Sequence, residues 1–161
     1  MQDINIRAAS PSDLPRLLEL EQALIEAERP YDPTLKPPPV CYYDLASMLV
    51  NPNLFLLVAD DGRQVIATGY VRIDPDKHFL KHAQKAYFGF MYVVPEYRGR
   101  GINGSIMKEL KDWAMRKGIY ECRLDVYAPN RSAMTAYEKM GFRPYSLEMR
   151  MDLRDDTSRT I

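Results

Sequence analysis

The most informative segment of this chain is Val93-Val94-Pro95-Glu96-Tyr97-Arg98-Gly99-Arg100-Gly101-Ile102-Asn103-Gly104. An apolar run ends at Pro95, a turn rich in glycine and arginine follows, and a helical pattern begins at Ile102. The start of a helix exposes unpaired backbone N–H groups at the positive end of the helix dipole, and glycines let an anion approach the backbone closely. Arg98 and Arg100 add charged donors that suit phosphate oxygens. The segment therefore predicts a cradle for a pyrophosphate group.

Periodic apolar patterns on both sides of this segment predict alternating strands and helices. Strands are predicted at 4–7, 55–59, 65–73, 86–94, 121–127 and 142–153, the last bent at Pro144, and helices at about 10–28, 44–50, 102–117 and 130–140. The run at 86–94 is nearly continuous in apolar residues, which predicts a strand buried on both faces. The turn Asp60-Asp61-Gly62 predicts a hairpin between the flanking strands. This order of elements predicts an α/β fold, with helices on both faces of a mixed sheet.

The composition of the chain limits its class. A length of 161 residues is usual for one domain, and we expect a single domain at 1–153 followed by a flexible polar tail at 154–161. The 22 Lys and Arg residues balance the 22 Asp and Glu residues, which argues against a nucleic-acid partner. Cys41 and Cys122 are too few for a disulfide framework and indicate free thiols in a reducing compartment. With no signal-peptide pattern and no apolar run of about 18 residues, a cytoplasmic protein without a membrane anchor is expected.

The spacing Gly99-x-Gly101-x-x-Gly104 also matches the fingerprint of dinucleotide-binding folds. That fingerprint opens the first strand–helix unit of a large sheet, whereas here it begins at residue 99 of 161, after a hairpin. Too little chain remains for the usual two halves. Glu121 stands about twenty positions further on, where such folds place an acidic residue, but acidic residues are common. A dinucleotide such as NAD is therefore an alternative ligand of the loop.

The loop resembles the acyl-CoA signature of the GNAT superfamily of N-acetyltransferases, Q/R-x-x-G-x-G/A, with Arg98 and Gly101 in register. Met91-Tyr92-Val93-Val94-Pro95 is similar to the strand that precedes this signature in the family, and Asn130-x-x-Ala133-x-x-x-Tyr137-x-x-x-Gly141-Phe142 is similar to a second family motif. The resemblance covers about 4–150 and is specific from 86 to 145. Asn103 departs from it, because the family usually has Gly or Ala there. Its N–H still donates, but its side chain must point away from the phosphates.

The resemblance implies a mostly antiparallel sheet in which the strands at 86–94 and 121–127 splay apart around acetyl-CoA, the acetyl donor. The backbone of Met91 to Val93 would pair with the pantetheine arm, and the amides from Gly99 to Gly104 would hold the pyrophosphate. Asn130 would bond the cofactor arm, cap its own helix, or do both. The implied cofactor-binding residues are Met91, Tyr92, Val93, Arg98, Gly99, Arg100, Gly101, Ile102, Asn103, Gly104 and Asn130.

The activity that the resemblance implies is transfer of the acetyl group to a primary amine, by direct attack through a tetrahedral intermediate. The acceptor would be a small molecule, such as a polyamine, an amino-acid-like amine or an aminoglycoside, or a protein N-terminus. Many members of the family dimerise, so a homodimer is expected, with no interface identified. The alternative from another class is a non-catalytic sensor domain that binds acyl-CoA. Retention of Tyr137 and Asp125 favours the enzyme.

Tyr137 and Asp125 are the candidate catalytic residues. Tyr137 lies seven residues after Asn130, which puts both on one helix face, and its phenol can protonate the leaving thiolate. The alternative is a core tyrosine packed under the sheet, and the match to the family motif favours the functional role. Asp125 precedes Asn130 by five residues, where the ribosomal-protein alanine acetyltransferases, which this segment resembles, carry a catalytic glutamate. It is the candidate general base, or else an aspartate paired with Arg123 or a lysine. A backbone N–H near Val93 would stabilise the oxyanion.

The proline-rich loop at 29–39 corresponds to the region that lines the acceptor cleft in the family. Glu28, Tyr31 and Tyr43 flank it, with Tyr42, and are the candidate substrate residues: the carboxylate attracts a cationic amine and the rings hold its alkyl body. Glu26 is a further acidic neighbour. Surface solvation and ordinary packing are the alternatives for these side chains. His78 and His82 have a helical spacing but no evident third ligand, so no metal is expected.

Overall fold

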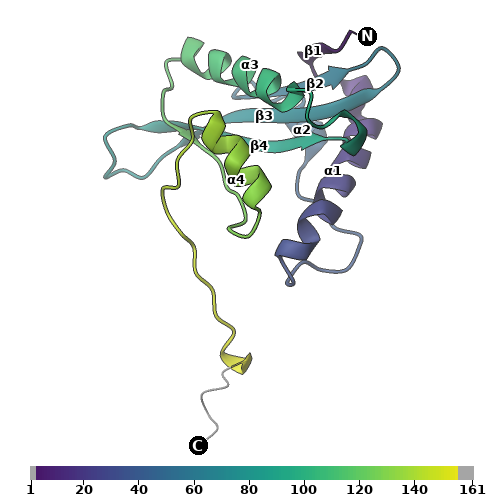
Figure 1. Ribbon diagram of the computed structural model, residues 1–161. Helices are drawn as coiled ribbons and strands as arrows, with labels where there is room; N and C mark the ends of the chain where they lie inside the picture. The colour runs from purple at the N-terminus through teal and green to yellow at the C-terminus, as the bar shows by residue number, and fades with distance from the viewer. Residues whose placement is uncertain (1–2, 156–161) are drawn as a thin grey trace, which may run out of the picture.

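The computed structural model describes residues 3–155, which build a five-stranded sheet in the order β1-β2-β3-β4-β5 (Figure 1). The strands are β1 Asn5–Ala8, β2 Leu54–Asp60, β3 Val65–Pro75, β4 Gln84–Val93 and β5 Cys122–Arg123. Neighbours from β1 to β4 are antiparallel, and β4 and β5 are parallel. The predicted mixed, mostly antiparallel sheet is confirmed.

The helices follow the predicted positions closely. They are α1 Leu14–Glu28, α2 Leu45–Met48, α3 Ile102–Arg116 and α4 Arg131–Lys139, with short 3-10 turns η1 Pro11–Asp13, η2 Arg29–Tyr31, η3 Pro95–Tyr97 and η4 Leu153–Asp155. None of the helices within residues 3–155 has the length and apolar character needed to cross a membrane.

The core lies in two layers, one on each face of the sheet. Helices α3 and α1 cover these two faces (Figure 1). Side chains alternate along a strand, so Leu57 on β2 packs in the layer under α3, whereas Leu56 packs in the layer under α1. Leu110 of α3 and Leu20 of α1 are fully buried anchors of these layers. The predicted arrangement of helices on both faces is therefore confirmed.

Strand β4 contains a bulge, which breaks the regular alternation of its side chains. Between Gly89 and Tyr92, β4 has one more residue than the facing part of β3, and Phe90 takes up the irregularity with a φ of 52°. Phe88 consequently packs on the α3 side and Phe90 on the α1 side, although both lie on the same side of an ideal strand. Burial on both faces was too strong an expectation, because the residues between the buried ones are only half-buried.

Two further expectations need correction. The strand predicted at 121–127 is reduced to Cys122–Arg123, which pairs with Ala86 and Tyr87 of β4, and beyond that point the two segments separate. The strand predicted at 142–153 is wrong, because this extended segment has no strand partner within residues 3–155. It runs away from the sheet instead (Figure 1). Of the predicted tail, residues 156–161 lie outside the described residues.

Candidate active site

The loop between β4 and α3 is shaped by glycines in the left-handed region. Gly99 has a φ of 75° and Gly101 a φ of 77°, values that side chains rarely permit. The turn before them is tied down by N–H groups of Tyr97 and Arg98, which donate to Val94 and Pro95 at 3.0 and 3.2 Å. The chain therefore enters α3 along a fixed path, with glycine where the backbone must reverse.

The first turn of α3 presents its amide groups to open space. The N–H of Ser105 donates to the carbonyl of Gly101 at 3.0 Å, and the amides before it have no earlier helical residue to bond. Gly101 caps the helix without a side chain. A Cβ placed on Gly99, Gly101 or Gly104 would meet no atom within 4 Å. The donor set and the space fit a pyrophosphate group.

Both arginines of the loop are exposed and held by their neighbours. Arg98 donates from Nε to the carbonyl of Val93 at 2.9 Å and lies over the ring of Tyr92. Arg100 donates to the carbonyl of Glu96 at 3.1 Å and lies 4.8 Å from the centroid of Tyr97. Their remaining N–H groups are available for phosphate oxygens. Pre-positioned guanidinium groups lose less side-chain entropy when they bind an anion.

Asn103 accommodates its departure from the family pattern by turning inward. Its Oδ1 is buried without a hydrogen-bond partner, so the side chain leaves the helix start clear. Asn130 caps α4, because its Oδ1 accepts the N–H of Ala133 at 3.2 Å. The capping role predicted for Asn130 is therefore present in the structure.

The end of β4 has one free edge. Met91 to Val93 lie beyond the residues of β4 that pair with β5, and on the other side β3 pairs with Tyr92 and Val93. The N–H of Val94 donates to Ile66 on β3 at 2.9 Å. Since successive N–H groups of a strand point to opposite edges, the N–H of Val93 points to the free edge. This is the edge along which a pantetheine arm was predicted to pair.

Tyr137 lies half-buried on α4, with its ring against Phe142 at a centroid distance of 6.1 Å. Burial raises the pKa of Tyr137 to about 12, and the negative charge of Glu28 contributes to that rise. The phenol therefore keeps its proton at neutral pH. Because the charge of Glu28 acts on Tyr137, the end of α1 and the side of α4 that carries Tyr137 lie near each other.

Glu28 is surrounded by tyrosines from separate segments. Burial raises the pKa of Glu28 above its ordinary value, although the nearby hydroxyl of Tyr42 opposes the shift. That hydroxyl is buried and makes no well-formed hydrogen bond. After burial itself, the charge of Glu28 also helps to raise the pKa of Tyr43 and Tyr127. Glu28 and Tyr137, predicted from different motifs, thus lie close enough for the charge of Glu28 to act on the phenol of Tyr137.

The tyrosines after the proline-rich loop are held by a buried carboxylate that the sequence reasoning missed. Glu21 is fully buried, and its Oε1 accepts the N–H groups of Tyr42 at 2.7 Å and Tyr43 at 2.8 Å. The missed signal is its position: Glu21 lies between Leu20 and Leu24 on the apolar face of α1. An acidic residue there must meet a polar partner inside the protein.

The other candidate substrate residues differ in exposure and in role. Tyr43 packs in the core, 4.9 Å from Phe90 between ring centroids. Tyr31 stacks on Tyr127 at 6.2 Å. The hydroxyl of Tyr127 in turn donates to Asp32 at 3.3 Å. These contacts of Tyr127 therefore join the proline-rich loop to the segment that follows β5.

Asp125 is exposed and accepts the hydroxyl of Tyr87 at 2.8 Å. The predicted alternative, a pair with Arg123, is wrong, because Arg123 bonds Glu121 at 2.6 Å. His82 contacts Asp76 at 2.7 Å. No group of metal-ligating side chains occurs among the described residues, around His82 or elsewhere.

Comparison with known families identifies the fold and the loop together. The sequence profile of the acetyltransferase (GNAT) family matches residues 17–142, which include both the loop and the second motif. The chain belongs to this family. Its members take the acetyl group from acetyl-CoA, so the predicted class, an acetyl-CoA-dependent N-acetyltransferase, is confirmed at the level of the family.

Curated relatives match the chain either closely over a short part or weakly over most of it. The thialysine N-epsilon-acetyltransferase of Bos taurus is 42% identical over 55 residues, which span 34% of this chain and 32% of that protein. The glucosamine 6-phosphate N-acetyltransferase of Trypanosoma brucei brucei is 27% identical over 94% of this chain and 97% of its own length. The N-alpha-acetyltransferase RimI of Mycobacterium tuberculosis is 28% identical over 92% of this chain and 84% of its own. The chain thus covers about a third of the first of these relatives and most of the others.

Solved structures agree on the fold. A predicted acetyltransferase of Clostridium acetobutylicum, crystallised with acetyl-CoA, superposes with a TM-score of 0.73 at 22% identity over 96% of this chain and 99% of its own. An acetyltransferase of Trypanosoma brucei gives a TM-score of 0.70 at 26% identity, over 94% of this chain and 100% of its own. At 22% identity, the similarity to the Clostridium acetobutylicum protein shows the fold alone.

Proposed function

We propose that this protein transfers the acetyl group of acetyl-CoA to a cationic primary amine by direct attack through a tetrahedral intermediate. The observation that carries the proposal is the set of open amides at the start of α3 beside the free edge of β4, which suits acetyl-CoA, and the charge of Glu28 acting on Tyr137 supports it. The relatives bear names for acetylation of different amines, and this range is consistent with an amine acceptor.

Bound acetyl-CoA supplies the reactive thioester. The amides from Gly99 to Gly104 and the guanidinium groups of Arg98 and Arg100 hold the pyrophosphate. The free edge at Met91 to Val93 pairs with the pantetheine arm. The N–H of Val93 points to that edge and donates to the oxyanion as it forms, and a fixed backbone donor of this kind is effective because it needs no reorganisation.

The tyrosine side chain of α4 acts as the general acid. The phenol of Tyr137, whose pKa burial raises to about 12, is protonated at neutral pH, and it can donate a hydrogen bond to the sulfur as the thiolate departs. Its hydroxyl has no acceptor among the described side chains, so the proton is not engaged elsewhere. A Phe at this position keeps the ring packing and removes only the proton donor.

Two carboxylates can take the proton of the amine, and we assign this step to Glu28. Burial raises the pKa of Glu28 toward the working pH, which improves a carboxylate as a base, whereas Asp125 is exposed and already bonded by Tyr87. Assignment of the base to Asp125 from the sequence stays a prediction, and one experiment compares the two. Glu28 and the surrounding tyrosines also favour a cationic amine with an aliphatic body.

The experiment screens acetyl-CoA against polyamines, amino-acid amides, aminoglycosides and short peptides, then measures the pH dependence of kcat/KM with the best acceptor. Glu28→Gln should lower kcat/KM by about 100-fold or more and remove the fall in rate on the acid side. Glu26→Gln is the matched control, because Glu26 lies two residues earlier, is exposed and pairs with Arg29. Asp125→Asn should change kcat/KM only a few-fold. If Asp125→Asn, and not Glu28→Gln, removed the fall of kcat/KM at low pH, Asp125 would be the base.

A further inference from the structure

The turn between β2 and β3, residues 61–64, presents a buried carboxylate to the loop that precedes α3. Asp61 is 5% exposed, and its Oδ1 accepts the N–H groups of Arg63 and Gln64, each at 2.9 Å. Its Oδ2 accepts the hydroxyl of Tyr97. One oxygen of the carboxylate thus holds its own turn, and the other bonds the segment between β4 and α3.

The hydrogen bond between Tyr97 and Asp61 extends the attachment of this segment to the sheet. Because β3 begins beside the end of β4, the N–H of Val94 donates to the carbonyl of Ile66 at 2.9 Å. Within residues 3–155, this is the last backbone hydrogen bond between the β2–β3 hairpin and the chain that leaves β4. The hydroxyl of Tyr97 makes the next hydrogen bond to the hairpin. It therefore fixes η3, where the loop begins.

The ring of Tyr97 in turn holds Arg100. The guanidinium of Arg100 lies 4.8 Å from the centroid of that ring, and it donates to the carbonyl of Glu96 at 3.1 Å. Arg100 is exposed and stands between Gly99 and Gly101, both in the left-handed region. Glycines allow a backbone many conformations, so a side chain between them is poorly fixed by the loop itself. The place of the Tyr97 ring therefore determines where the guanidinium lies.

At neutral pH the proton of the hydrogen bond stays on Tyr97. The bond to the Asp61 carboxylate is the main cause that raises the pKa of the Tyr97 phenol. The same bond, together with the N–H groups of the turn, lowers the pKa of Asp61 to about 2. Asp61 is therefore an anion and Tyr97 a neutral donor throughout the physiological pH range. An anion, a neutral ring and a cation follow one another in the order Asp61, Tyr97, Arg100.

We propose that Tyr97 and Asp61 are positioning residues for acetyl-CoA: the carboxylate fixes the phenol, and the phenol ring holds Arg100 where the pyrophosphate binds. The inference rests on the proposed role of Arg100 in holding that pyrophosphate. A group that is ordered before the ligand arrives loses less entropy on binding, so the pair increases the affinity for CoA. Neither residue is assigned a contact with the reacting atoms, and the effect is therefore on binding and not on kcat.

Calorimetric titration of the full-length protein with CoA tests the inference without any amine acceptor. Tyr97→Phe keeps the ring and removes the hydroxyl, and it should raise the Kd for CoA about 10-fold, the lower end of what a hydrogen bond to a charged group contributes. If the effect passes through Arg100, Tyr97→Phe should change the Kd less than about 2-fold in an Arg100→Gln background. Asp61→Asn removes the acceptor of the hydroxyl, so it should add less than about 2-fold to Tyr97→Phe.

The salt dependence of the Kd separates positioning of a charge from a merely structural role. Salt screens contacts between exposed charges, so the ratio of the Kd of Tyr97→Phe to that of the unaltered protein should fall from about 10 at low salt to about 3 or less near 0.5 M NaCl. A structural role would keep this ratio constant. Thermal unfolding without ligand checks that each variant is folded, and Asp61→Asn replaces Tyr97→Phe if the latter is not.

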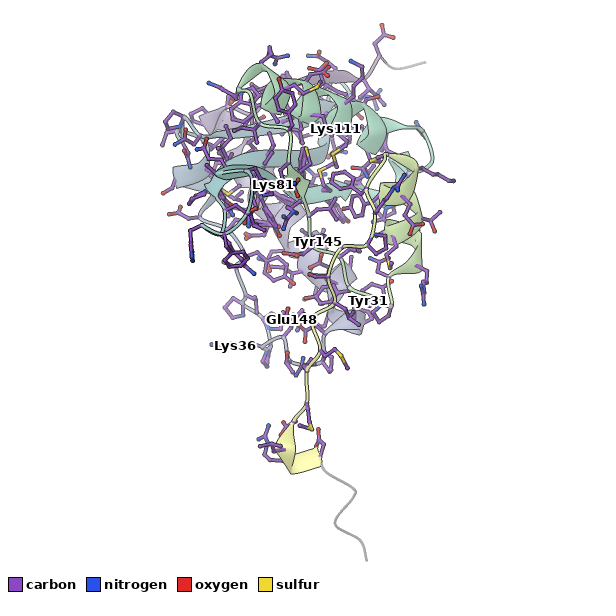
Figure 2. All side chains as sticks on the ribbon, turned by 90° about the vertical axis from the view of Figure 1, so that its left-hand side faces the viewer. Tyr31, Lys36, Lys81, Lys111, Tyr145 and Glu148 are labelled. Atoms are coloured by element: carbon purple, nitrogen blue, oxygen red, sulfur yellow. The ribbon has the colours of Figure 1, made fainter. Side chains whose placement is uncertain are left out.

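Two controls lie toward the opposite end of the sheet. Tyr87→Phe also removes a hydroxyl that donates to an aspartate, Asp125, at 2.8 Å. Lys81→Gln removes an exposed cation in the connection between β3 and β4, which Figure 2 shows facing the viewer with Lys81 labelled. Both variants should leave the Kd for CoA and its salt dependence unchanged.

The outcomes separate this inference from the assignment of the loop. If Arg100→Gln weakened CoA binding and Tyr97→Phe did not, the positioning role alone would be overturned. Additive effects of Tyr97→Phe and Arg100→Gln, or a ratio indifferent to salt, would also overturn it. An unchanged CoA affinity in Arg100→Gln would refute the role of Arg100 at the pyrophosphate, and this inference with it.

Discussion

Substitution of Gly101 by alanine is the sharpest test of the phosphate loop, because the same helix supplies a matched control. Gly101 precedes the first residue of α3 with a φ of 77°, and Gly118 follows its last turn with a φ of 74°. A Cβ at either position would meet no atom within 4 Å. Gly101→Ala and Gly118→Ala therefore impose the same backbone strain at opposite ends of one helix.

The magnitudes follow from the strain and from the ligand. Alanine in the left-handed region costs about 1–2 kcal/mol, so both variants should unfold roughly 2–8 °C earlier than the unaltered protein without ligand. Only Gly101 aligns the amides proposed to hold the pyrophosphate. Loss of charge-assisted hydrogen bonds worth about 1.5–3 kcal/mol weakens acetyl-CoA binding roughly 10- to 100-fold. At a concentration of about 100 Kd, ligand stabilisation then falls from about 2.7 to about 0.4–1.4 kcal/mol.

The assay is thermal unfolding of the three proteins with and without acetyl-CoA, followed by calorimetric titration. Gly118→Ala should keep the full rise in Tm on addition of acetyl-CoA, and Gly101→Ala should lose about half of it or more. Equal loss in both variants would mean that helix stability, and not the loop, controls binding. An unchanged acetyl-CoA affinity in Gly101→Ala would refute the pyrophosphate assignment.

The remaining predictions concern the acid, the acceptor loop and the start of α1. Tyr137→Phe should lower kcat by about 100-fold with an unchanged acetyl-CoA Kd, and full activity in steady-state assays would remove the general-acid role. Glu21→Ala frees the N–H groups of Tyr42 and Tyr43, so it should raise KM for the amine several-fold while calorimetry gives the same Kd for acetyl-CoA. Hydrogen bonds from Arg7 lower the pKa of Asp13 from 3.8 to about 2, so this carboxylate stabilises the fold fully above pH 3.8 and loses that effect as the pH falls through about 2. Asp13→Asn should therefore reduce the free energy of unfolding by about 1–2 kcal/mol at neutral pH and by much less near pH 2, and urea titrations with the same difference at both pH values would contradict this.

Elements whose evidence is local could be predicted from the sequence. The loop from Arg98 to Gly104 is contiguous, so its glycines, charges and helix start are visible in one segment. The helices at α1, α3 and α4 follow from apolar spacing and capping residues. The alternation of apolar and polar residues at 142–153 was also visible in the sequence. A strand requires a partner, however, and the sequence alone does not reveal whether a partner strand is present.

The parts that depend on distant segments could not be predicted. The bulge at Phe90 reverses which side chains of β4 face α3, because one extra residue shifts a period of two. The proximity of Glu28 to Tyr137 relates the end of α1 to the last turn of α4, and no spacing in the sequence encodes it. The exposure of Asp125 depends on the point at which β5 stops pairing with β4, and the sequence does not show that point. Candidate residues were therefore identifiable one by one, but their arrangement in space was not.

The central claim, acetyl transfer to an amine, is tested most directly by mass spectrometry of amine acceptors incubated with acetyl-CoA and the enzyme. We expect multiple turnovers of a cationic primary amine to its monoacetylated form, release of free CoA in equal amount, and about 100-fold slower formation with Tyr137→Phe. Binding of acetyl-CoA without an acetylated product from any amine class in the screen would contradict the claim and favour a domain that senses acyl-CoA without turnover.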